Sequence, residues 1–240
     1  MTESDITAMS EWIKKEVEKA GAAGAVFGIS GGIDSAVTAA LCKKAAGDNS
    51  LGLIMPCHSL EEDLRHAELV SSTIGVSTQR IDLAPAFDGL KALLPPGNQI
   101  ACANLKPRLR MITLYYFSNL HNYLVVGTGN KSEISLGYFT KYGDGGVDIL
   151  PLGDLLKDEV REIARLLRIP REIIEKAPSA GLWAGQTDES EMGVTYNAID
   201  KYLSDKKEEV SPEKRERISA MIAKSVHKRD PLPVYRKISH

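Results

Sequence analysis

The segment GISGGIDSA, from Gly28 to Ala36, combines residue types that suit the binding of an anion. Glycines at this spacing let backbone N–H groups turn toward a common point, and a helix that begins there adds the positive end of its dipole. Ser30 and Ser35 supply hydroxyl donors to the same place. The segment therefore predicts a phosphate-binding loop.

Asp34 sets this loop apart from phosphate loops of the Walker A type, which carry a lysine after their last glycine. Here Ile33 and Asp34 follow that glycine. A carboxylate is repelled by a polyphosphate unless a cation lies between them, so Asp34 indicates a bound Mg²⁺. The alternative is a glycine turn with an aspartate at a helix N-terminus, which the two serines and the preceding apolar run disfavour.

The elements that must hold this loop alternate between short apolar runs and helical patterns. Strands are predicted over 23–30, 51–57, 77–83 and 123–130, and helices over 5–20, 34–46, 59–75 and 106–122. This alternation predicts an α/β fold with a doubly wound, mostly parallel sheet flanked by helices, as in Rossmann-like proteins. Ligands on such sheets bind at the carboxyl ends of the strands, where the loop lies.

Beyond residue 131 the pattern changes. Loops are predicted over 133–155 and 178–191, and helices over 155–168, 171–176, 191–203 and 212–227. No repeat, low-complexity tract or linker divides the chain, so we expect residues 1–240 to form a single domain.

Local signals mark the ends of three predicted helices. Gly47 is placed to end the helix 34–46, because glycine adopts the left-handed conformation that helix ends favour. Ser59 and Glu62 have the spacing of a capping box. Ser211 followed by Pro212 suits the start of the helix 212–227.

The composition is that of an ordinary soluble globular protein. The chain has 30 Lys and Arg against 32 Asp and Glu, a formal charge of −2, which argues against a general nucleic-acid or membrane partner. Cys42, Cys57 and Cys102 form no C-x-x-C pair and predict neither a disulfide framework nor a zinc finger. The N-terminus lacks the features of a signal peptide, and no apolar run suits a membrane span. We therefore expect a cytoplasmic protein.

The sequence SGGIDS resembles the signature loop of the ATP pyrophosphatase (PP-loop) superfamily. The resemblance implies an adenine nucleotide alpha hydrolase-like fold. It also implies ATP cleavage between the α- and β-phosphates, adenylation of a carbonyl oxygen, and displacement of AMP by a nitrogen or sulfur nucleophile.

Five further motifs resemble those of NAD⁺ synthetases, which amidate deamido-NAD⁺ (nicotinic acid adenine dinucleotide). In chain order they are NLKPRLR (104–110), GTGNKSE (127–133), GYFTKYGDGGVDILPL (137–152), PSAGLWAGQTDE (178–189) and HKRDP (227–231). The resemblance implies amidation of deamido-NAD⁺ with ammonia through an adenylated intermediate, with release of AMP and pyrophosphate. GTGNKSE stands where many small bacterial members have GTDHAAE.

The resemblance also implies roles for particular residues. Those implied for ATP are Gly28, Ile29, Ser30, Gly31, Gly32, Ile33, Asp34, Ser35, Thr128, Lys157 and Ser179. Asp34 and Glu133 are the implied metal ligands, and with Lys157 they are the expected catalytic groups. Those implied for deamido-NAD⁺ are Arg108, Phe139, Lys141, Asp148, His227 and Lys228. To these we add the hypothesis that Asp144 positions or deprotonates the ammonium.

Several of these residues have plainer explanations. Lys157 by itself indicates an exposed lysine on a helix, and His227 with Lys228 suits the charged end of one. Phe139 and Tyr142 fit nicotinyl stacking and ordinary packing equally well.

The nitrogen donor is expected to be free ammonia, or ammonia from a separate partner. Glutamine-dependent members carry an amidase domain before the synthetase part, whereas here the phosphate loop begins at residue 28. We also expect the loops 140–147 and 181–190 to order when substrates bind.

A homodimer is implied by the family, with helix 106–122 as its candidate contact, although a buried core helix explains the same apolar pattern. Two other functions remain as alternatives: a different PP-loop ligase, such as one that thiolates tRNA, and a nucleotide sensor without catalysis. The neutral charge balance disfavours the tRNA enzyme, and the combination of Asp34, Glu133 and Lys157 disfavours the sensor.

Overall fold

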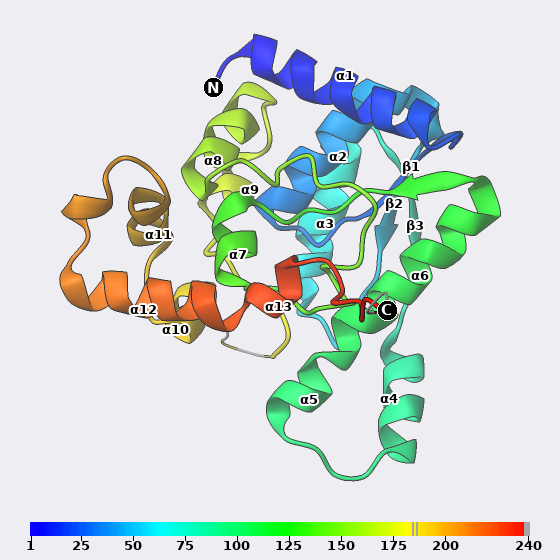
Figure 1. Ribbon diagram of the computed structural model, residues 1–240. Helices are drawn as coiled ribbons and strands as arrows, with labels where there is room; N and C mark the ends of the chain where they lie inside the picture. The colour runs from blue at the N-terminus through cyan, green and yellow to red at the C-terminus, as the bar shows by residue number, and fades with distance from the viewer. Residues whose placement is uncertain (184, 186, 238–240) are drawn as a thin grey trace.

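The computed structural model describes residues 1–183, 185 and 187–237, and its centre is a parallel sheet of four strands (Figure 1). The strands are β1 (Gly24–Gly28), β2 (Ser50–Ile54), β3 (Ser77–Arg80) and β4 (Tyr123–Val125). Their order is β3-β2-β1-β4, and every neighbouring pair is parallel. The order reverses at β1, so the chain winds outward in both directions from the strand that leads into the phosphate loop.

Alternate side chains of the strands feed two separate cores. Ala25 and Phe27 of β1 point into one core, whereas Val26 between them points into the other. β3 is polar and exposed, as expected of a short edge strand. Gly52 of β2 leaves room for Ile29, whose Cδ1 would lie only 2.5 Å from a Cβ at that position. The sequence thus places β1 and β2 at the centre of the molecule.

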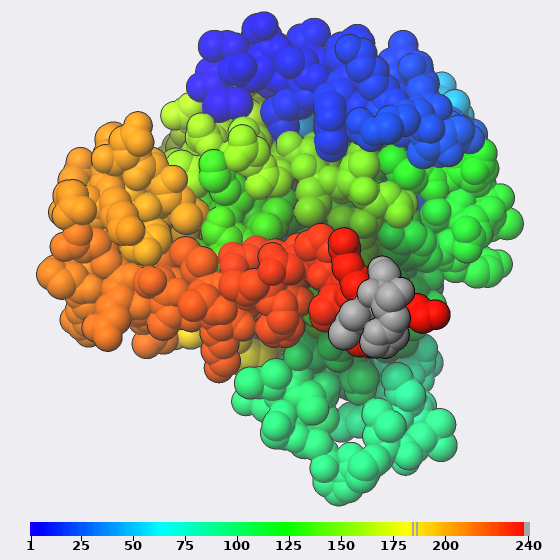
Figure 2. Space-filling view, in the orientation of Figure 1, coloured from blue at the N-terminus to red at the C-terminus, as the bar shows by residue number. Residues whose placement is uncertain are grey.

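Helices cover both faces of the sheet (Figure 1). One core lies under α1 (Glu3–Lys19), α2 (Ile33–Ala46), α3 (Glu61–Ile74), α8 (Lys157–Leu166) and α9 (Arg171–Glu175). The other lies under α4 (Ala84–Leu93) and α6 (Leu105–His121), with α5 (Gln99–Ala103) beside α6. The space-filling view shows α4 and α5 projecting from the body (Figure 2).

A third apolar cluster lies beside the sheet. It is built by α7 (Lys131–Leu136), α10 (Asp188–Met192), α11 (Tyr196–Leu203) and α12 (Pro212–Lys224), and α13 (Val226–Arg229) follows. Short 3₁₀ turns at Gly47–Asn49 and Lys207–Glu209 complete the list of elements. Among the described helices, none has both the length and the apolarity to cross a bilayer.

The expected fold class is confirmed, and the differences are local. The predicted Ser59 capping box is wrong: Leu60 is the N-cap residue of α3, and the Ser59 Oγ accepts from the Cys57 N–H instead. The predicted helix 191–203 is two helices separated by Gly193, which has a positive φ of 67°. The stretch 133–155, predicted as loops, contains most of α7, and α4 and α5 were not predicted.

Candidate functional site

The phosphate loop connects β1 to α2 and is held by its own hydroxyl groups. The Ser35 Oγ accepts from the Ser30 N–H at 3.2 Å and donates to the Gly32 carbonyl at 2.8 Å. The Ser30 Oγ accepts from the Gly32 N–H at 3.3 Å. No side chain of the described residues caps the start of α2, so its N-terminal N–H groups face the open side of the loop. This is the geometry of an anion site.

Gly31 is fixed by its surroundings. It has a positive φ of 79°, and a Cβ there would lie 2.6 Å from the Asp63 carbonyl oxygen and 2.7 Å from the His66 Cβ. Both contacts are on α3, the next helix of the sheet. The loop can therefore lie this close to α3 only with glycine at position 31.

Three charged side chains from distant segments meet beside this loop. Lys157, the first residue of α8, donates from Nζ to the Asp34 Oδ2 at 2.5 Å and to the Glu133 Oε1 at 3.1 Å. Asp34 lies in the first turn of α2 and Glu133 in the first turn of α7. The Lys157 side chain is 1% exposed, which excludes the explanation of an exposed surface lysine.

The α7 N-terminus holds the two carboxylates in register. Asn130 accepts from the Glu133 N–H at 3.0 Å as a helix cap and donates from Nδ2 to the Asp34 Oδ1 at 2.8 Å. The Glu133 carboxylate returns to the Asn130 N–H, completing a capping box. Asn130, which is fully buried, therefore orients both acids, Asp34 through its side-chain amide and Glu133 through its backbone N–H.

The electrostatics of the trio follow from its burial. Burial raises the pKa of Glu133 to about 7, although the Lys157 ammonium opposes the shift. Burial alone lowers the pKa of Lys157, but Asp34 and Glu133 outweigh it and hold that pKa above its ordinary value. The ammonium is therefore permanently charged between two carboxyl groups.

The donor set fits a hard divalent cation that also binds phosphate. The ammonium between Asp34 and Glu133 marks a position where positive charge is stabilised by carboxylate oxygens. Within the described residues no three His, Cys, Asp or Glu side chains gather to hold a metal by themselves. Mg²⁺ does not need three, because it commonly takes one or two carboxylates, with phosphates and water completing its shell.

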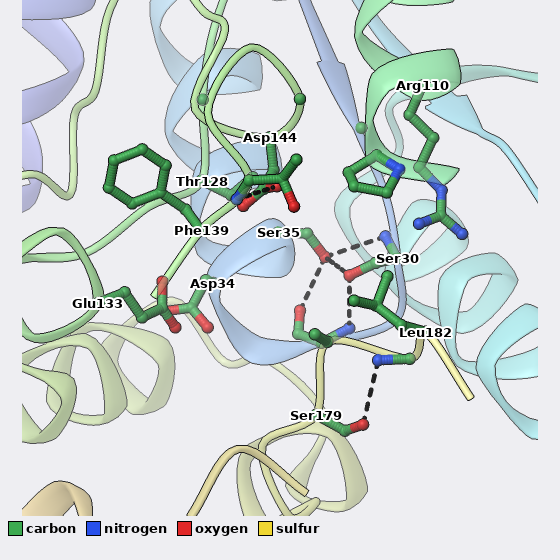
Figure 3. Close-up of a pocket in the computed structure, with 18 of the residues that line it drawn as sticks. Ser30, Asp34, Ser35, Arg110, Thr128, Glu133, Phe139, Asp144, Ser179 and Leu182 are labelled. Carbon is green, nitrogen blue, oxygen red and sulfur yellow. Dashed lines mark hydrogen bonds between the residues drawn. The ribbon is translucent and has the colours of Figure 1, made fainter. Parts of the chain in front are cut away.

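A pocket of about 450 Å³ opens from this centre and lies within the size range of ligand sites. Thr128 and Asp144 lie on one side of it, Phe139 beside Glu133, and Ser179 with Leu182 on the opposite wall (Figure 3). The Asp144 Oδ1 accepts from the Thr140 N–H at 3.0 Å, and desolvation by the surrounding loop raises the pKa of its carboxyl.

Most residues predicted for ATP line this pocket, and Gly31 packs on α3 instead. Only two of those predicted for deamido-NAD⁺ line it: Phe139, and Lys228, whose ammonium lies 5.3 Å from the centre of the Phe139 ring. In this loop, Tyr142 is exposed and lies outside the pocket.

The other four predicted dinucleotide residues lie outside the pocket lining. Arg108 donates to the Lys141 carbonyl at 3.4 Å, and the Lys141 ammonium donates to the His227 carbonyl, so these three form one chain of contacts. Asp148 accepts from the Tyr115 hydroxyl and from the Val125 N–H, both at 2.8 Å. Both Asp148 oxygens are thus engaged at the end of β4.

Several residues of the pocket were not predicted from the sequence. Arg110 points its guanidinium toward Ser30 (Figure 3), and its Nε donates to the Met55 carbonyl at 3.2 Å. The sequence contained a signal for Arg110. It lies three residues after Pro107 and four before Leu114, on the buried face of α6, where a charged side chain is unusual unless it is paired or functional.

An ion pair that was also not predicted connects α3 to the segment before Ser179. The Lys176 ammonium donates to the Asp63 Oδ1 at 2.6 Å, and both residues line the pocket. In the glycine-rich loop that follows, residues 184 and 186 lie outside the described residues. Asp188 at its end, which also lines the pocket, and Tyr196 beyond it were not predicted either; the Tyr196 hydroxyl donates to both Glu133 and Asp188.

The chain is similar to known proteins over nearly its whole length. The family model described as NAD synthase matches residues 5–232. The NH₃-dependent NAD⁺ synthetase of Finegoldia magna is 49% identical over 92% of this chain and 91% of its own length. That of Archaeoglobus fulgidus is 46% identical over 98% and 97%.

A solved structure is similar over the whole chain. The structure of NMN synthetase from Francisella tularensis superposes with a TM-score of 0.94 at 38% identity, covering 99% of this chain and 100% of that one.

Proposed function

Because the chain belongs to the NAD synthase family and catalyses ATP-dependent amidation of deamido-NAD⁺ with ammonia, we propose that the pocket at the phosphate loop is its active site. The observation that carries this assignment is the convergence of Asp34, Glu133 and Lys157 beside the loop. A nucleotide-binding protein without catalysis has no need for two partly buried carboxylates bridged by a buried ammonium at its phosphate site.

The proposal assigns ATP to the pocket, with its triphosphate on the loop from Gly28 to Ser35. Asp34 and Glu133 would hold Mg²⁺, which when bound draws charge from the phosphate oxygens. Lys157 and the N-terminus of α2 stabilise the negative charge that grows on the departing pyrophosphate. Ser179 and Thr128 supply hydroxyl donors from the pocket walls.

The chemical difficulty is that a carboxylate is a poor electrophile near neutral pH. Transfer of AMP to the nicotinate carboxylate neutralises it and provides a leaving group, after which ammonia attacks the acyl carbon. No side chain has to become covalently bound, so the protein acts by positioning and electrostatics. We assign Asp144 the task of holding or deprotonating the ammonium, since it is a carboxylate exposed to the pocket.

We further propose that the chain acts as a single synthetase domain and as a homodimer. Arg108, Ile112, Tyr116 and Leu120 are exposed and follow one another at intervals of four along α6. This spacing gives one stripe on the helix, apolar except for Arg108 at its head. Packing two such stripes together would place Arg108, Lys141 and His227 at the boundary between subunits, beside the proposed dinucleotide.

The cytoplasm is the proposed location. Cys42, Cys57 and Cys102 are all free thiols, as is usual in a reducing compartment. Cys42 and Cys57 are also fully buried.

A second acceptor is favoured by one comparison. The structural neighbour with a TM-score of 0.94 is described as an NMN synthetase, and NMN is the amide of nicotinic acid mononucleotide. The mononucleotide carries the same nicotinate carboxylate without the adenylyl half. We therefore include it as an alternative acceptor for the same chemistry.

The deciding experiment supplies ATP, Mg²⁺ and ammonium with deamido-NAD⁺ or nicotinic acid mononucleotide in separate reactions. A third reaction replaces ammonium by glutamine. We expect NAD⁺, AMP and pyrophosphate from the dinucleotide with ammonium, and no product with glutamine. A higher kcat/KM for the mononucleotide would reverse the assignment of acceptor, and absence of ATP cleavage would contradict the proposed function.

A further inference from the structure

Next to Glu133 lies a buried tyrosine, Tyr196, which does not line the pocket and which the mechanism above does not use. The Tyr196 hydroxyl lies 3.2 Å from the Glu133 Oε1 and 2.9 Å from the Asp188 Oδ2. Tyr196 is 1% exposed and Asp188 is 5% exposed, so water does not compete for these contacts. The hydroxyl is thus shared between the Glu133 carboxylate and a second buried acid.

The ring of the same tyrosine faces the ammonium of the trio. The Lys157 Nζ lies 4.8 Å from the centre of the Tyr196 ring, within the range of a cation–π contact. Tyr196 therefore contacts two members of the trio with two different parts of its side chain. A phenylalanine at this position would keep the ring contact and lose only the hydroxyl.

One turn further along α11, Asp200 supports the backbone of the same centre. Its carboxylate accepts from the Ser132 hydroxyl at 2.5 Å and from the Asp158 N–H at 3.0 Å. Ser132 in turn accepts from the Lys157 N–H at 3.1 Å. Tyr196 and Asp200 are four residues apart and therefore lie on one face of α11. Through these two side chains, this face forms hydrogen bonds with the first turns of both α7 and α8.

Asp188 connects this support to the loop on the pocket wall. Its N–H donates to the Pro178 carbonyl at 3.0 Å, next to Ser179. The Tyr138 hydroxyl donates to its other carboxylate oxygen at 3.2 Å. The position of the Ser179 segment and the orientation of Glu133 are therefore linked through Asp188 and Tyr196.

We propose that Tyr196 is a positioning residue that fixes the Glu133 carboxylate for divalent-cation binding, with Asp188 holding the tyrosine hydroxyl in place. The proposal rests on the metal site assigned above to Asp34 and Glu133. Hydrogen-bond partners behind a metal ligand orient it, and their removal typically lowers metal affinity about 10- to 100-fold.

The test measures binding of Mn²⁺ by electron paramagnetic resonance, with α,β-methylene-ATP present so that no turnover occurs. We expect Tyr196→Phe to weaken Mn²⁺ binding about tenfold or more. The matched control is Tyr202→Phe on the same helix, where the ring contacts Lys207 rather than the trio. Control and wild type should bind Mn²⁺ alike. Equal affinity in Tyr196→Phe and wild type would overturn the proposal.

Two further variants separate this proposal from the metal site on which it rests. Asp34→Asn and Glu133→Gln should each lose Mn²⁺ binding, and retention in both would contradict the metal site itself. Their loss with Tyr196→Phe unaffected would contradict only the role of Tyr196.

A purely structural role for the tyrosine makes a different prediction. It would lower the melting temperature of Tyr196→Phe without changing Mn²⁺ affinity at a temperature where the variant is folded. If Tyr196→Phe does not fold, Asp188→Asn serves in its place, because it keeps the tyrosine and alters the partner of its hydroxyl. Wild-type affinity in that variant would equally overturn the proposal.

Discussion

At the scale of single residues, Lys157 makes the strongest prediction about stability. Replacing it with methionine leaves Asp34 and Glu133 facing each other without the ammonium that bridges them. Removing one partner of a buried ion pair typically costs about 3–5 kcal/mol. We therefore expect Lys157→Met to lower the melting temperature in metal-free buffer and to abolish synthesis of the amide. Lys131→Met, which removes a surface pair with Asp154, is the control and should change little.

The same variant should show a characteristic pH dependence. Burial raises the pKa of Glu133 to about 7, and removing the ammonium would raise it further. A carboxyl whose pKa is higher in the folded protein stabilises the fold below its unfolded pKa, and this stability is lost as pH rises through the folded pKa. The deficit of Lys157→Met relative to wild type should therefore be smaller near pH 5.5 than near pH 8.5. The stability deficit is measured by thermal unfolding monitored by circular dichroism at both pH values. A deficit independent of pH would contradict its attribution to the pKa of Glu133.

Asp144 is the residue on which the nitrogen step is expected to depend. Asp144→Asn keeps the oxygen that accepts from the Thr140 N–H and removes the negative charge. We expect kcat/KM for ammonium to fall about 100-fold, as for loss of an acid–base group, with little change in KM for ATP. Steady-state assays with varied ammonium test this, and an unchanged ammonium dependence would reject the assignment.

Local and distant contacts explain which site residues the sequence could predict. Asp34, Ser30 and Ser35 belong to one continuous loop whose chemistry is visible in nine residues. Lys157 is different, because only the packing of α8 on α2 brings it to Asp34, and its importance came from the family resemblance. Tyr196 lies within the predicted helix 191–203, and a helical pattern does not reveal which atom its hydroxyl faces.

At the scale of elements, the two glycine-rich segments predict a change in protease sensitivity. Trypsin should cut at Lys141 and an endoprotease specific for glutamate at Glu189, both in or beside the pocket loops. ATP with deamido-NAD⁺ should slow both cuts, because closed loops protect the adenylate from water. At about 100 times Kd the open population falls about 100-fold. Tryptic cleavage at the remote Lys207 serves as the control, and equal rates with and without ligands would contradict loop closure.

The elements themselves were predictable where the chain carries dense runs of apolar residues. β1, β2 and the helices α2 and α6 follow from runs whose burial the pattern already indicates. The segment 84–103 was not predicted, and in the structure α4 buries only Phe87 and α5, with five residues, only Ala103. α7 was hidden for a related reason: its six residues are too few to display a helical period.

At the scale of the whole molecule, the exposed stripe on α6 predicts how copies associate. Ile112, Tyr116 and Leu120 are each about 60% exposed. Placing an arginine among them should prevent the burial of two stripes against each other. We therefore expect Tyr116→Arg to sediment as a monomer of about 26 kDa and wild type as a dimer. Leu93→Arg at the end of α4 is the control, since Leu93 is exposed but belongs to a different helix from the stripe. A monomeric wild type would contradict the expected contact.

The two residues of the Asp34–Lys157 ion pair are synthesised at different times. It joins residues 123 positions apart, and Tyr196 comes later still. During synthesis at about 5–20 residues per second, roughly 6–25 s separate the emergence of the acid from that of its ammonium partner. Through that interval the nascent phosphate loop carries an unneutralised carboxylate that favours hydration over burial. The catalytic centre thus matures only after Lys157 and Tyr196 have been synthesised, and the appearance of ligase activity reports that the chain has been assembled at least that far.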